Sequence, residues 1–337
     1  MPSRGRSISS PQCSRGKMRT IISRMPSGQI RSFGPSIVAI AILIAYFSIV
    51  NPLFLSYENA GNIGRQSSVL LMVSLAETVI ILIGSIDLSI GALVTLTGIL
   101  SALTVDALGI VGSMAVAVVT GAVVGLINGV IVTQLRVPSF LVTLGMLSIL
   151  SGIANQISQG QSIIFENQIL PNMMNGSLFL HVPNVIWFAV LTTVIFTLIA
   201  FRTRLGRYLY ALGGGEIVAS NAGVPVTFYK IVAFVISGGV CGLAGVMLTG
   251  QVGAGTPTAG SGLLLNAIAA VVMGGTALSG GVGGPHRTFL GVLVIAILTN
   301  GMDVTQVNSF TQDIVKGIVI ILAVSLTIDR SKYLFIK

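Results

Sequence analysis

Residues 109–133 read GIVGSMAVAVVTGAVVGLINGVIVT, a run without a single Asp, Glu, Lys or Arg. An apolar stretch of about 20 residues is long enough for an α-helix to cross the hydrocarbon core of a bilayer. A helix also satisfies its own backbone hydrogen bonds, which lipid requires of any segment that spans it. This stretch therefore predicts a transmembrane helix.

The composition of the whole chain agrees with this prediction. Its 337 residues are 53% hydrophobic and only 8% charged, whereas soluble domains carry about a quarter charged residues. The 41 glycines and the single tryptophan suit helices that pack closely through small residues. We therefore predict an all-α, polytopic membrane protein.

Similar apolar segments recur along the chain, and we expect ten transmembrane helices. The segments are 37–56, 67–84, 87–105, 109–133, 138–157, 185–201, 230–250, 263–280, 288–302 and 314–328. Those at 87–105 and 263–280 are short and rich in glycine, a pattern that also fits broken or re-entrant helices. A count of eight or nine helices therefore stays open.

Lys and Arg indicate the orientation, because they gather in cytoplasmic segments. Residues 1–35 hold seven of them and no acidic residue, and residues 158–184 hold none. Ten spans place both termini in the cytoplasm. The tail lacks the apolar core of a secretory signal, and we expect a lipid-surface anchor rather than a nucleic-acid-binding segment. The predicted parts are a disordered basic tail (1–35), a membrane domain (36–329) with a cytoplasmic loop (203–229), and a short C-terminal tail (330–337).

One polar stretch interrupts the apolar pattern: RTRLGRYLYALGGGEIVASNAGV, residues 202–224. Within it, residues 216–223 have a composition compatible with a helix, and Glu216 would favour the positive end of the helix dipole. Gly213–Gly215 form a flexible entry, and Gly223 with the following Pro225 forms a stop. We expect a short cytoplasmic helix here, and an ordinary surface helix is the alternative.

This loop resembles the coupling helix of ABC importer permeases, which docks into a groove of the ATPase subunit. The spacing from Glu216 to Gly223 suits the ribose-type branch of that family. Further stretches resemble the same branch, in the family's order, so that the resemblance covers about residues 36–329. They are GSIDLSIGALVTLTG (84–98), VPSFLVTLGMLSILSGIA (137–154), TPTAGSGLLLNAIAAVVMGGTALSGG (256–281) and TNGMDVTQVNSFTQDIVKGIVIILAV (299–324).

The resemblance implies a permease subunit of the bacterial inner membrane that imports a ribose-type monosaccharide. It also implies a fold similar to that of the cobalamin importers, a separate ATPase, a periplasmic sugar-binding protein, and a second permease copy or a paralogue. The chain lacks a G-x-x-x-x-G-K-[ST] loop, so the ATPase would bind the ATP; we expect no enzyme activity, cofactor or metal here. Residues 263–266 read Leu-Leu-Leu-Asn where the family often has aromatic-Glu-Leu-Asp, which leaves the sugar and the dimer partner open. The residues that would couple to the ATPase are Gly213, Gly214, Glu216, Ala219, Gly223 and Pro225.

A few charged and polar residues lie in or near the spans, where each must face protein or water. Glu77 fits a buried hydrogen-bond hub, a pathway residue or a protonated carboxyl, and Asp87 fits a helix-start cap near the cytoplasmic edge or a sugar ligand. The alternative function is an ion-coupled secondary transporter that uses Glu77 or Asp87. We expect an ion pair between Asp313 and Lys316. The polar residues that could line the pathway or bridge helices are Asn128, Asn155, Asn266 and Asn300.

Overall fold

The computed structural model describes residues 34–179 and 181–327, which are almost entirely helical. The predicted tails, 1–35 and 330–337, lie outside this part of the chain except for Gly34 and Pro35. The elements in chain order are α2 (Gly34–Val50), η1 (Pro52–Leu55), α3 (Tyr57–Leu82), α4 (Ile90–Gln134), α5 (Ser139–Ser158), β1 (Ile163–Ile164), α6 (Ile169–Asn175), α7 (Asn184–Arg202), α8 (Arg204–Gly214), α9 (Glu216–Asn221), α10 (Val226–Val252), β2 (Ala254–Gly255), α11 (Leu263–Met273), α12 (Pro285–Val304) and α13 (Ser309–Thr327).

Each apolar segment predicted from the sequence contains a helix. Those at 87–105 and 109–133 share α4, which is broken at Gly109, where φ is 67° and ψ is −178°. The Asn128 amide donates to the hydroxyl oxygen of Ser89 over 3.1 Å. Because Ser89 precedes the first half of α4 and Asn128 lies late in the second, the two halves form an antiparallel hairpin that turns at Gly109.

Six of the described helices are long and apolar enough to cross a membrane: α3, α4, α5, α7, α10 and α12. The prediction of a polytopic helical membrane protein is therefore confirmed. The segment expected at 263–280 is helical only as far as Met273. Its second half is a turn, because Gly275, Gly280 and Gly281 have positive φ angles that do not continue a helix.

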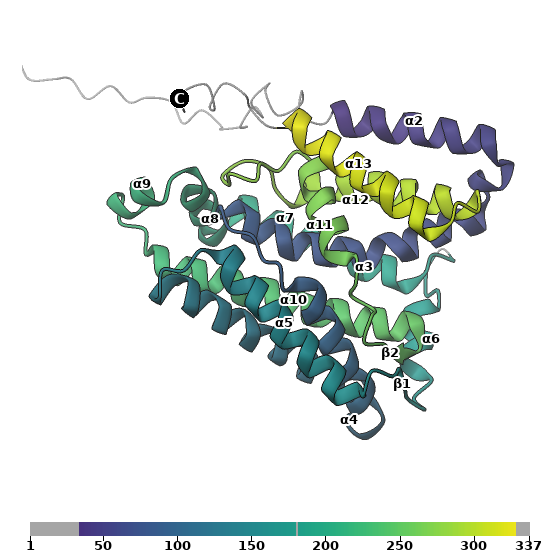
Figure 1. The fold of residues 1–337 in the computed structure, drawn as a ribbon, viewed down its shortest axis with the longest axis horizontal. Helices are drawn as coiled ribbons and strands as arrows, with labels where there is room; N and C mark the ends of the chain where they lie inside the picture. Colours follow the sequence, from purple (N-terminus) through teal and green to yellow (C-terminus); the bar gives the residue numbers. More distant parts are fainter. Residues whose placement is uncertain (1–33, 180, 328–337) are drawn as a thin grey trace, which may run out of the picture.

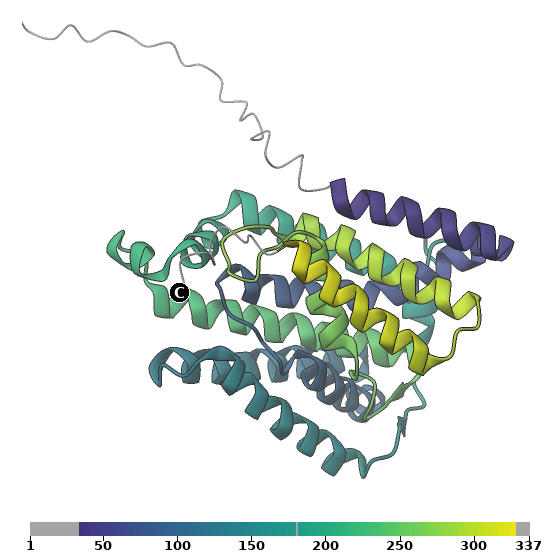
Figure 2. The ribbon, with the colours of Figure 1, turned by 45° about the horizontal axis from the view of Figure 1, so that its top comes forward.

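The helices run between two ends of the bundle, which we call the α9 end and the strand end (Figures 1 and 2). At the α9 end, the Gly281 N–H donates to the Leu82 carbonyl over 3.0 Å. At the strand end, β1 pairs antiparallel with β2, and the Asn51 amide donates to the Val304 carbonyl over 3.1 Å. Both α2 and α13 place their outer termini at the α9 end. The loops and helix termini that the sequence predicted on one side of the membrane therefore lie at the same end of the bundle.

The most extensive contact between two helices joins α4 and α10, which lie in the lower layer of Figure 1 together with α5. Three glycines of α4, spaced four residues apart, face α10: Gly121, Gly125 and Gly129. A Cβ at Gly121 would overlap the Gly238 carbonyl of α10, and one at Gly125 would overlap the Phe234 carbonyl. No side chain separates the two backbones at these glycines, so the helices approach closely. Close packing of this kind is how helices gain packing energy in lipid.

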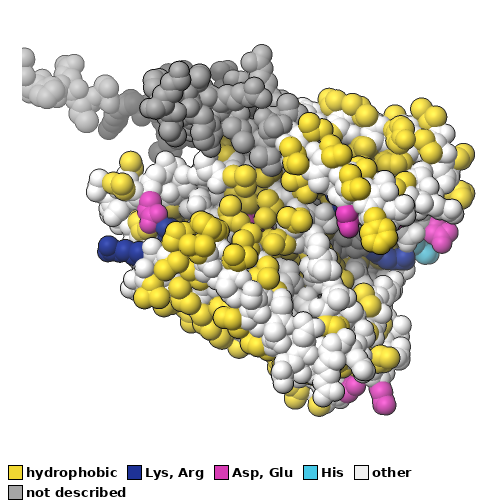
Figure 3. Space-filling view, in the orientation of Figure 1, with side chains coloured by type: hydrophobic (Ala, Val, Ile, Leu, Met, Phe, Trp, Pro, Cys, Tyr) yellow, Lys and Arg dark blue, Asp and Glu magenta, His cyan; other side chains and the backbone are white. Residues whose placement is uncertain are grey.

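Large apolar side chains remain exposed along the outer faces of several helices (Figure 3). Val111 of α4, Leu191 of α7 and Ile42 of α2 are 82%, 57% and 61% exposed. A soluble protein rarely exposes apolar surface this extensively. These faces fit contact with lipid tails.

Replacing Gly121 with Val should destabilise the protein, because the new side chain would overlap backbone that cannot move aside. Overpacking costs about 1–3 kcal/mol, and we expect the melting temperature of the detergent-purified protein to fall by about 5 °C or more. Gly145→Val in α5 is the matched control, since nothing lies within 4 Å of a Cβ there. Equal losses in the two variants would contradict the importance of the α4–α10 contact.

Candidate functional site at the α9 end

The predicted polar loop forms two helices at one end of the bundle. Helix α8 starts where Thr203 accepts a hydrogen bond from the Gly206 N–H over 3.2 Å, which caps the helix. Leu209 and Leu212 on one face are buried, while Arg204 and Arg207 are exposed. Helix α8 therefore lies against the bundle with its basic side outward.

Helix α9, at the far left of Figure 1, is the short helix that the sequence predicted. It contains Glu216–Asn221 and contacts the rest of the chain through Ala219, which is 5% exposed. Ile217 and Val218 on its outer side are 77% and 73% exposed. The rest of the described chain thus leaves two neighbouring apolar side chains of this helix uncovered.

A glycine lies on each side of α9, because the backbone at these two positions adopts a positive φ angle. Gly215 has a φ of 158° and Gly223 a φ of 82°. Nothing lies within 4 Å of a Cβ at Gly223, so glycine is required there by the left-handed conformation rather than by a close approach. Pro225, two residues after Gly223, is the N-cap residue of α10, so the chain turns from α9 into α10 within a few residues.

The prediction that Gly213–Gly215 form one flexible entry is wrong for its first residue. Gly213 lies in the last turn of α8, and a Cβ there would overlap the Leu82 carbonyl and the backbone of Gly281. A residue packed this tightly against two other segments is a fixed point. Gly214 is the last residue of α8, and its backbone also lies against Gly281, so the junction with α9 begins after it.

A hydrogen bond reinforces this fixed point. The Tyr210 hydroxyl of α8 donates to the Gly283 carbonyl over 2.7 Å. Burial raises the pKa of the Tyr210 hydroxyl to about 12, against a smaller opposing effect of Arg287. The hydroxyl therefore stays protonated and remains a donor at neutral pH. Nothing in the sequence pattern signalled this contact, because its partners are 73 residues apart.

Glu216 forms an ion pair within the chain. Its Oε2 lies 2.6 Å from the Nζ of Lys230, which belongs to the second turn of α10. The Glu216 side chain is 52% exposed and that of Lys230 is 15% exposed. The pair ties the beginning of α9 to α10, and a carboxylate at a helix N-terminus is favourable in addition.

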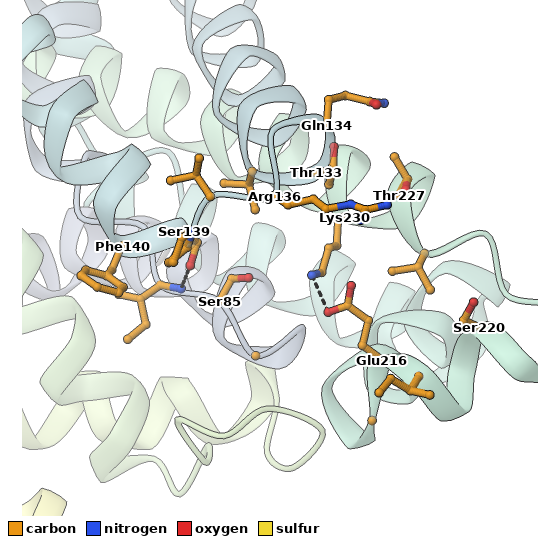
Figure 4. A pocket seen from close by; sticks show the side chains of 18 of the residues that line it. Ser85, Thr133, Gln134, Arg136, Ser139, Phe140, Glu216, Ser220, Thr227 and Lys230 are labelled. Carbon is orange, nitrogen blue, oxygen red and sulfur yellow. Dashed lines mark hydrogen bonds and ion pairs between the residues drawn. The ribbon is translucent and has the colours of Figure 1, made fainter.

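An open cavity of about 1330 Å³ lies beside α9 (Figure 4). Its walls are the α3–α4 turn, the end of α4 with the α4–α5 turn, helix α9 and the beginning of α10. The charged side chains in its lining are Arg136, Glu216 and Lys230. The sequence analysis did not single out Arg136 or Lys230 as site residues, because their nearness to Glu216 arises from the tertiary fold.

A second polar group lies inside the bundle, where Glu77 and Asp87 meet. The Asp87 N–H donates to Glu77 Oε1 over 3.3 Å, and Asp87 Oδ1 accepts from the Ser89 N–H and hydroxyl over 2.8 and 2.5 Å. Glu77, Asp87, Ser89 and Asn128 are all buried. Glu77 is thus a buried carboxyl, as the sequence suggested.

The interpretation of Asp87 as the cap of a helix start is wrong. The N-cap residue of α4 is Ser89, and Asp87 lies two residues earlier with only 3% exposure. It closes a turn onto Ser89 instead of bonding the first turn of the helix. In the described residues, no group of three His, Cys, Asp or Glu side chains is arranged to hold a metal ion.

The remaining predicted polar residues are dispersed. Asn300 of α12 accepts a hydrogen bond from the Asn59 amide over 2.9 Å in a buried contact, so it bridges helices. Asn155 of α5 is exposed and donates only to the Ser151 carbonyl within its own helix. Asn266 of α11 is partly exposed. Asp313 and Lys316 form the predicted ion pair, at 2.8 Å.

Comparisons with known proteins agree with the geometry of a membrane permease. Residues 59–324 match a family model described as a branched-chain amino acid transport system permease component. The chain is 37% identical to the ribose import permease RbsC of Escherichia coli K12, over 88% of this chain and 93% of RbsC. It is 36% identical to the D-allose transport system permease AlsC of the same organism, over 85% and 89% of the two chains. It is 33% identical to the L-arabinose ABC transporter permease AraH of Azospirillum brasilense, over 86% and 85%. No solved structure matches the chain.

The fold and these matches define a multi-pass permease of the bacterial inner membrane. The chain belongs to the family of transport-system permease components matched by residues 59–324. Members of this family are transport subunits, so the expectation of a non-enzyme is supported by the relatives.

Removing the Asp87 carboxylate should destabilise the protein. Asp87→Ala leaves two buried donors of Ser89 unpartnered, which costs about 1–3 kcal/mol each, whereas Asp87→Asn keeps an acceptor and should lose less. Asp106→Ala is the control: Asp106 also accepts from two backbone N–H groups, those of Glu166 and Asn167, but it is exposed, so water replaces it. Thermal unfolding in detergent measures all three variants, and an Asp87→Ala protein as stable as wild type would contradict this account.

Proposed function

We propose that this chain is the permease subunit of a bacterial ABC importer for a monosaccharide, of the ribose type or a related sugar. The relatives named for ribose, D-allose and L-arabinose match it over 85% or more of its length. All three named compounds are monosaccharides. The particular sugar is left to experiment.

We further propose that α9 is the element through which a separate ATPase drives transport. The observation that carries this proposal is the exposure of Ile217 and Val218, 77% and 73%, on a helix that projects from the α9 end. Apolar side chains at a projecting tip outside the apolar spans gain free energy when a soluble partner covers them. Permease components of ABC importers work with such an ATPase and with a binding protein, and the ATP is bound by that ATPase.

Each predicted coupling residue has a distinct part in this proposal. Gly213 and Gly214 hold the base of the element against Gly281, and the junction with α9 follows them. Glu216 holds the helix start through Lys230, and Ala219 packs the helix against the bundle. Gly223 and Pro225 turn the chain into α10. Helix α9 would thus rock as a unit on a fixed base.

The α9 end is proposed to face the cytoplasm. The described basic residues at that end outnumber its acidic residues, Glu216 and the buried Asp87; they are Arg136, Arg202, Arg204, Arg207, Lys230 and Arg287. Cytoplasmic segments carry such an excess. With α2, α11 and α13 counted as spans and α4 counted twice, the bundle has the ten helices proposed here, similar to a cobalamin importer, with both termini cytoplasmic.

The strand end is proposed to receive a periplasmic sugar-binding protein, and a second permease copy or a paralogue is proposed to complete the pathway. Asn155 and Asn266 are the candidates for its lining, because both are at least partly accessible. Asn128 and Asn300 are buried in contacts between helices, which favours a structural role. An ion-coupled transporter using Glu77 or Asp87 is not favoured, since the relatives named above are permeases of import systems.

Uptake of labelled sugar into cells tests the proposal. The chain, co-expressed with an ATPase and a binding protein encoded beside it, should import ribose, D-allose or L-arabinose, and uptake should require both partners. Gly223→Val should abolish uptake and ATPase co-purification, because a β-branched residue is strained at a φ of 82°. Glu216→Ala should act more mildly, since an exposed ion pair is worth about 0–1 kcal/mol.

Two matched controls accompany these variants. Gly214→Ala changes a glycine whose φ is not positive and whose Cβ would meet nothing within 4 Å, and it should keep uptake. Ile217→Ser should weaken ATPase association, while Leu178→Ser at the strand end, 88% exposed, should not. Full transport and ATPase association by Gly223→Val would show that α9 is not the coupling element.

Cysteine labelling tests the orientation. In a Cys13→Ser background, which leaves Cys241 buried, Leu178→Cys should react with an impermeant thiol reagent in intact cells with a permeable outer membrane. Val218→Cys should react only after lysis. The reverse pattern would overturn the proposed sidedness.

A further inference from the structure

The cavity beside α9 has an excess of positive charge. Its lining includes Arg136 and Lys230 but only one carboxylate, that of Glu216. Glu216 is already paired with Lys230 at 2.6 Å. Arg136 is exposed, and within the described residues its side chain has no hydrogen bond or ion pair. One guanidinium therefore remains available to an anionic group from outside the chain.

The backbone at Arg136 is held in an unfavourable conformation. Helix α4 ends at Gln134 with Leu135 as its C-cap residue, and Arg136 follows with a φ of 55°. Helices commonly end on a left-handed residue at this position, and glycine or asparagine occupies it at least cost. An asparagine in this conformation offsets the backbone strain with local side-chain hydrogen bonds. An arginine does not form these bonds, so the strain remains. A strained residue whose side chain lines a cavity points to a function for that side chain.

The position of the cavity indicates the partner. Figure 4 shows the Arg136 side chain extending past Lys230 toward Thr227, with the Glu216 carboxylate reaching Lys230 from α9. The same helix presents Ile217 and Val218 to a partner. A subunit that covers these two side chains would bring its own residues to the cavity mouth. A guanidinium is well suited to bind a carboxylate, because its planar N–H groups match the two oxygens.

We propose that this cavity is a second docking point for the ATPase subunit, and that it receives an Asp or Glu side chain which pairs with Arg136. The proposal rests on the proposed coupling role of α9. The ATPase would then hold the permease at two places, by apolar contact at Ile217 and Val218 and by an ion pair at Arg136. Arg136 lies in the turn that joins α4 to α5. A force that the ATPase exerts on Arg136 would therefore act on these two helices, which α9 does not reach directly.

Arg136→Gly separates function from folding. Glycine removes the charge and also relieves the left-handed strain, so the melting temperature in detergent should stay equal or rise. Binding of the purified ATPase to the permease in nanodiscs should weaken by about tenfold or more, as expected for the loss of a charge-assisted hydrogen bond. Arg204→Gln is the control, an exposed arginine at the same end that does not line the cavity, and it should leave ATPase affinity unchanged.

Covalent capture identifies the carboxylate. Arg136→Lys supplies an amine at the same place, and a carbodiimide should couple it to an Asp or Glu of the ATPase, giving an adduct that maps to residue 136. Unchanged ATPase affinity in Arg136→Gly, with affinity lost in Gly223→Val, would overturn this inference and leave the proposed function standing. Unchanged affinity in both variants would overturn both. A further outcome is that Arg136→Gly leaves ATPase affinity unchanged and weakens only the preference of the permease for phosphatidylglycerol over phosphatidylcholine in the nanodisc. The occupant of the cavity is then a lipid headgroup, and the proposal is wrong.

Discussion

The contact between α4 and α10 is the constraint on which the bundle depends. In lipid, helices gain nothing by hiding apolar side chains from a solvent that is itself apolar, so association relies on close packing. The glycines of α4 bring its backbone against that of α10, and Gly238 and Gly242 of α10 do the same in return. The hairpin turn at Gly109 lets both halves of α4 pack against α10, since Gly98 in the first half meets Gly245.

The α9 end combines a fixed base with an exposed tip. Helix α8 is held by the backbone contact of Gly213 and by the Tyr210 hydroxyl, whereas α9 touches the bundle mainly through Ala219 and the Glu216–Lys230 pair. A tip with few buried contacts opens at low free-energy cost, but its base does not move independently. In the proposed coupling, a displacement of α9 would reach the bundle through α10 and through the glycine-rich turn that follows α11.

The buried group around Glu77 joins segments that otherwise meet only through apolar contacts. Glu77 comes from α3, Asp87 and Ser89 from the α3–α4 turn, and Asn128 from the second half of α4. Hydrogen bonds between these buried polar groups favour one arrangement of the segments, and within the described residues only Glu77 Oε2 and Asn128 Oδ1 of this group have no partner. This group thus stabilises the position of the turn that also forms one wall of the cavity beside α9.

The sequence by itself determined the features that depend on local composition. Runs of apolar residues are long enough to span lipid, so the helices could be located, and the glycines that bound residues 216–221 marked α9 because few other residues adopt positive φ. The burial of Glu77 followed from its place inside an apolar segment. The family could also be recognised, since several motifs occur in order along the chain.

Only the tertiary structure decided which distant residues meet. Gly213 reads as a flexible residue in sequence, yet the backbone of Leu82 and Gly281 packs against it and fixes it. Asp87 reads as a helix cap, yet the chain turns so that Glu77 and Ser89 surround it. Arg136 and Lys230 lie 94 positions apart in the chain and line the same cavity only because α4 and α10 pack antiparallel near this end. Contacts of this kind depend on the relative placement of whole helices, which no local pattern of residues encodes.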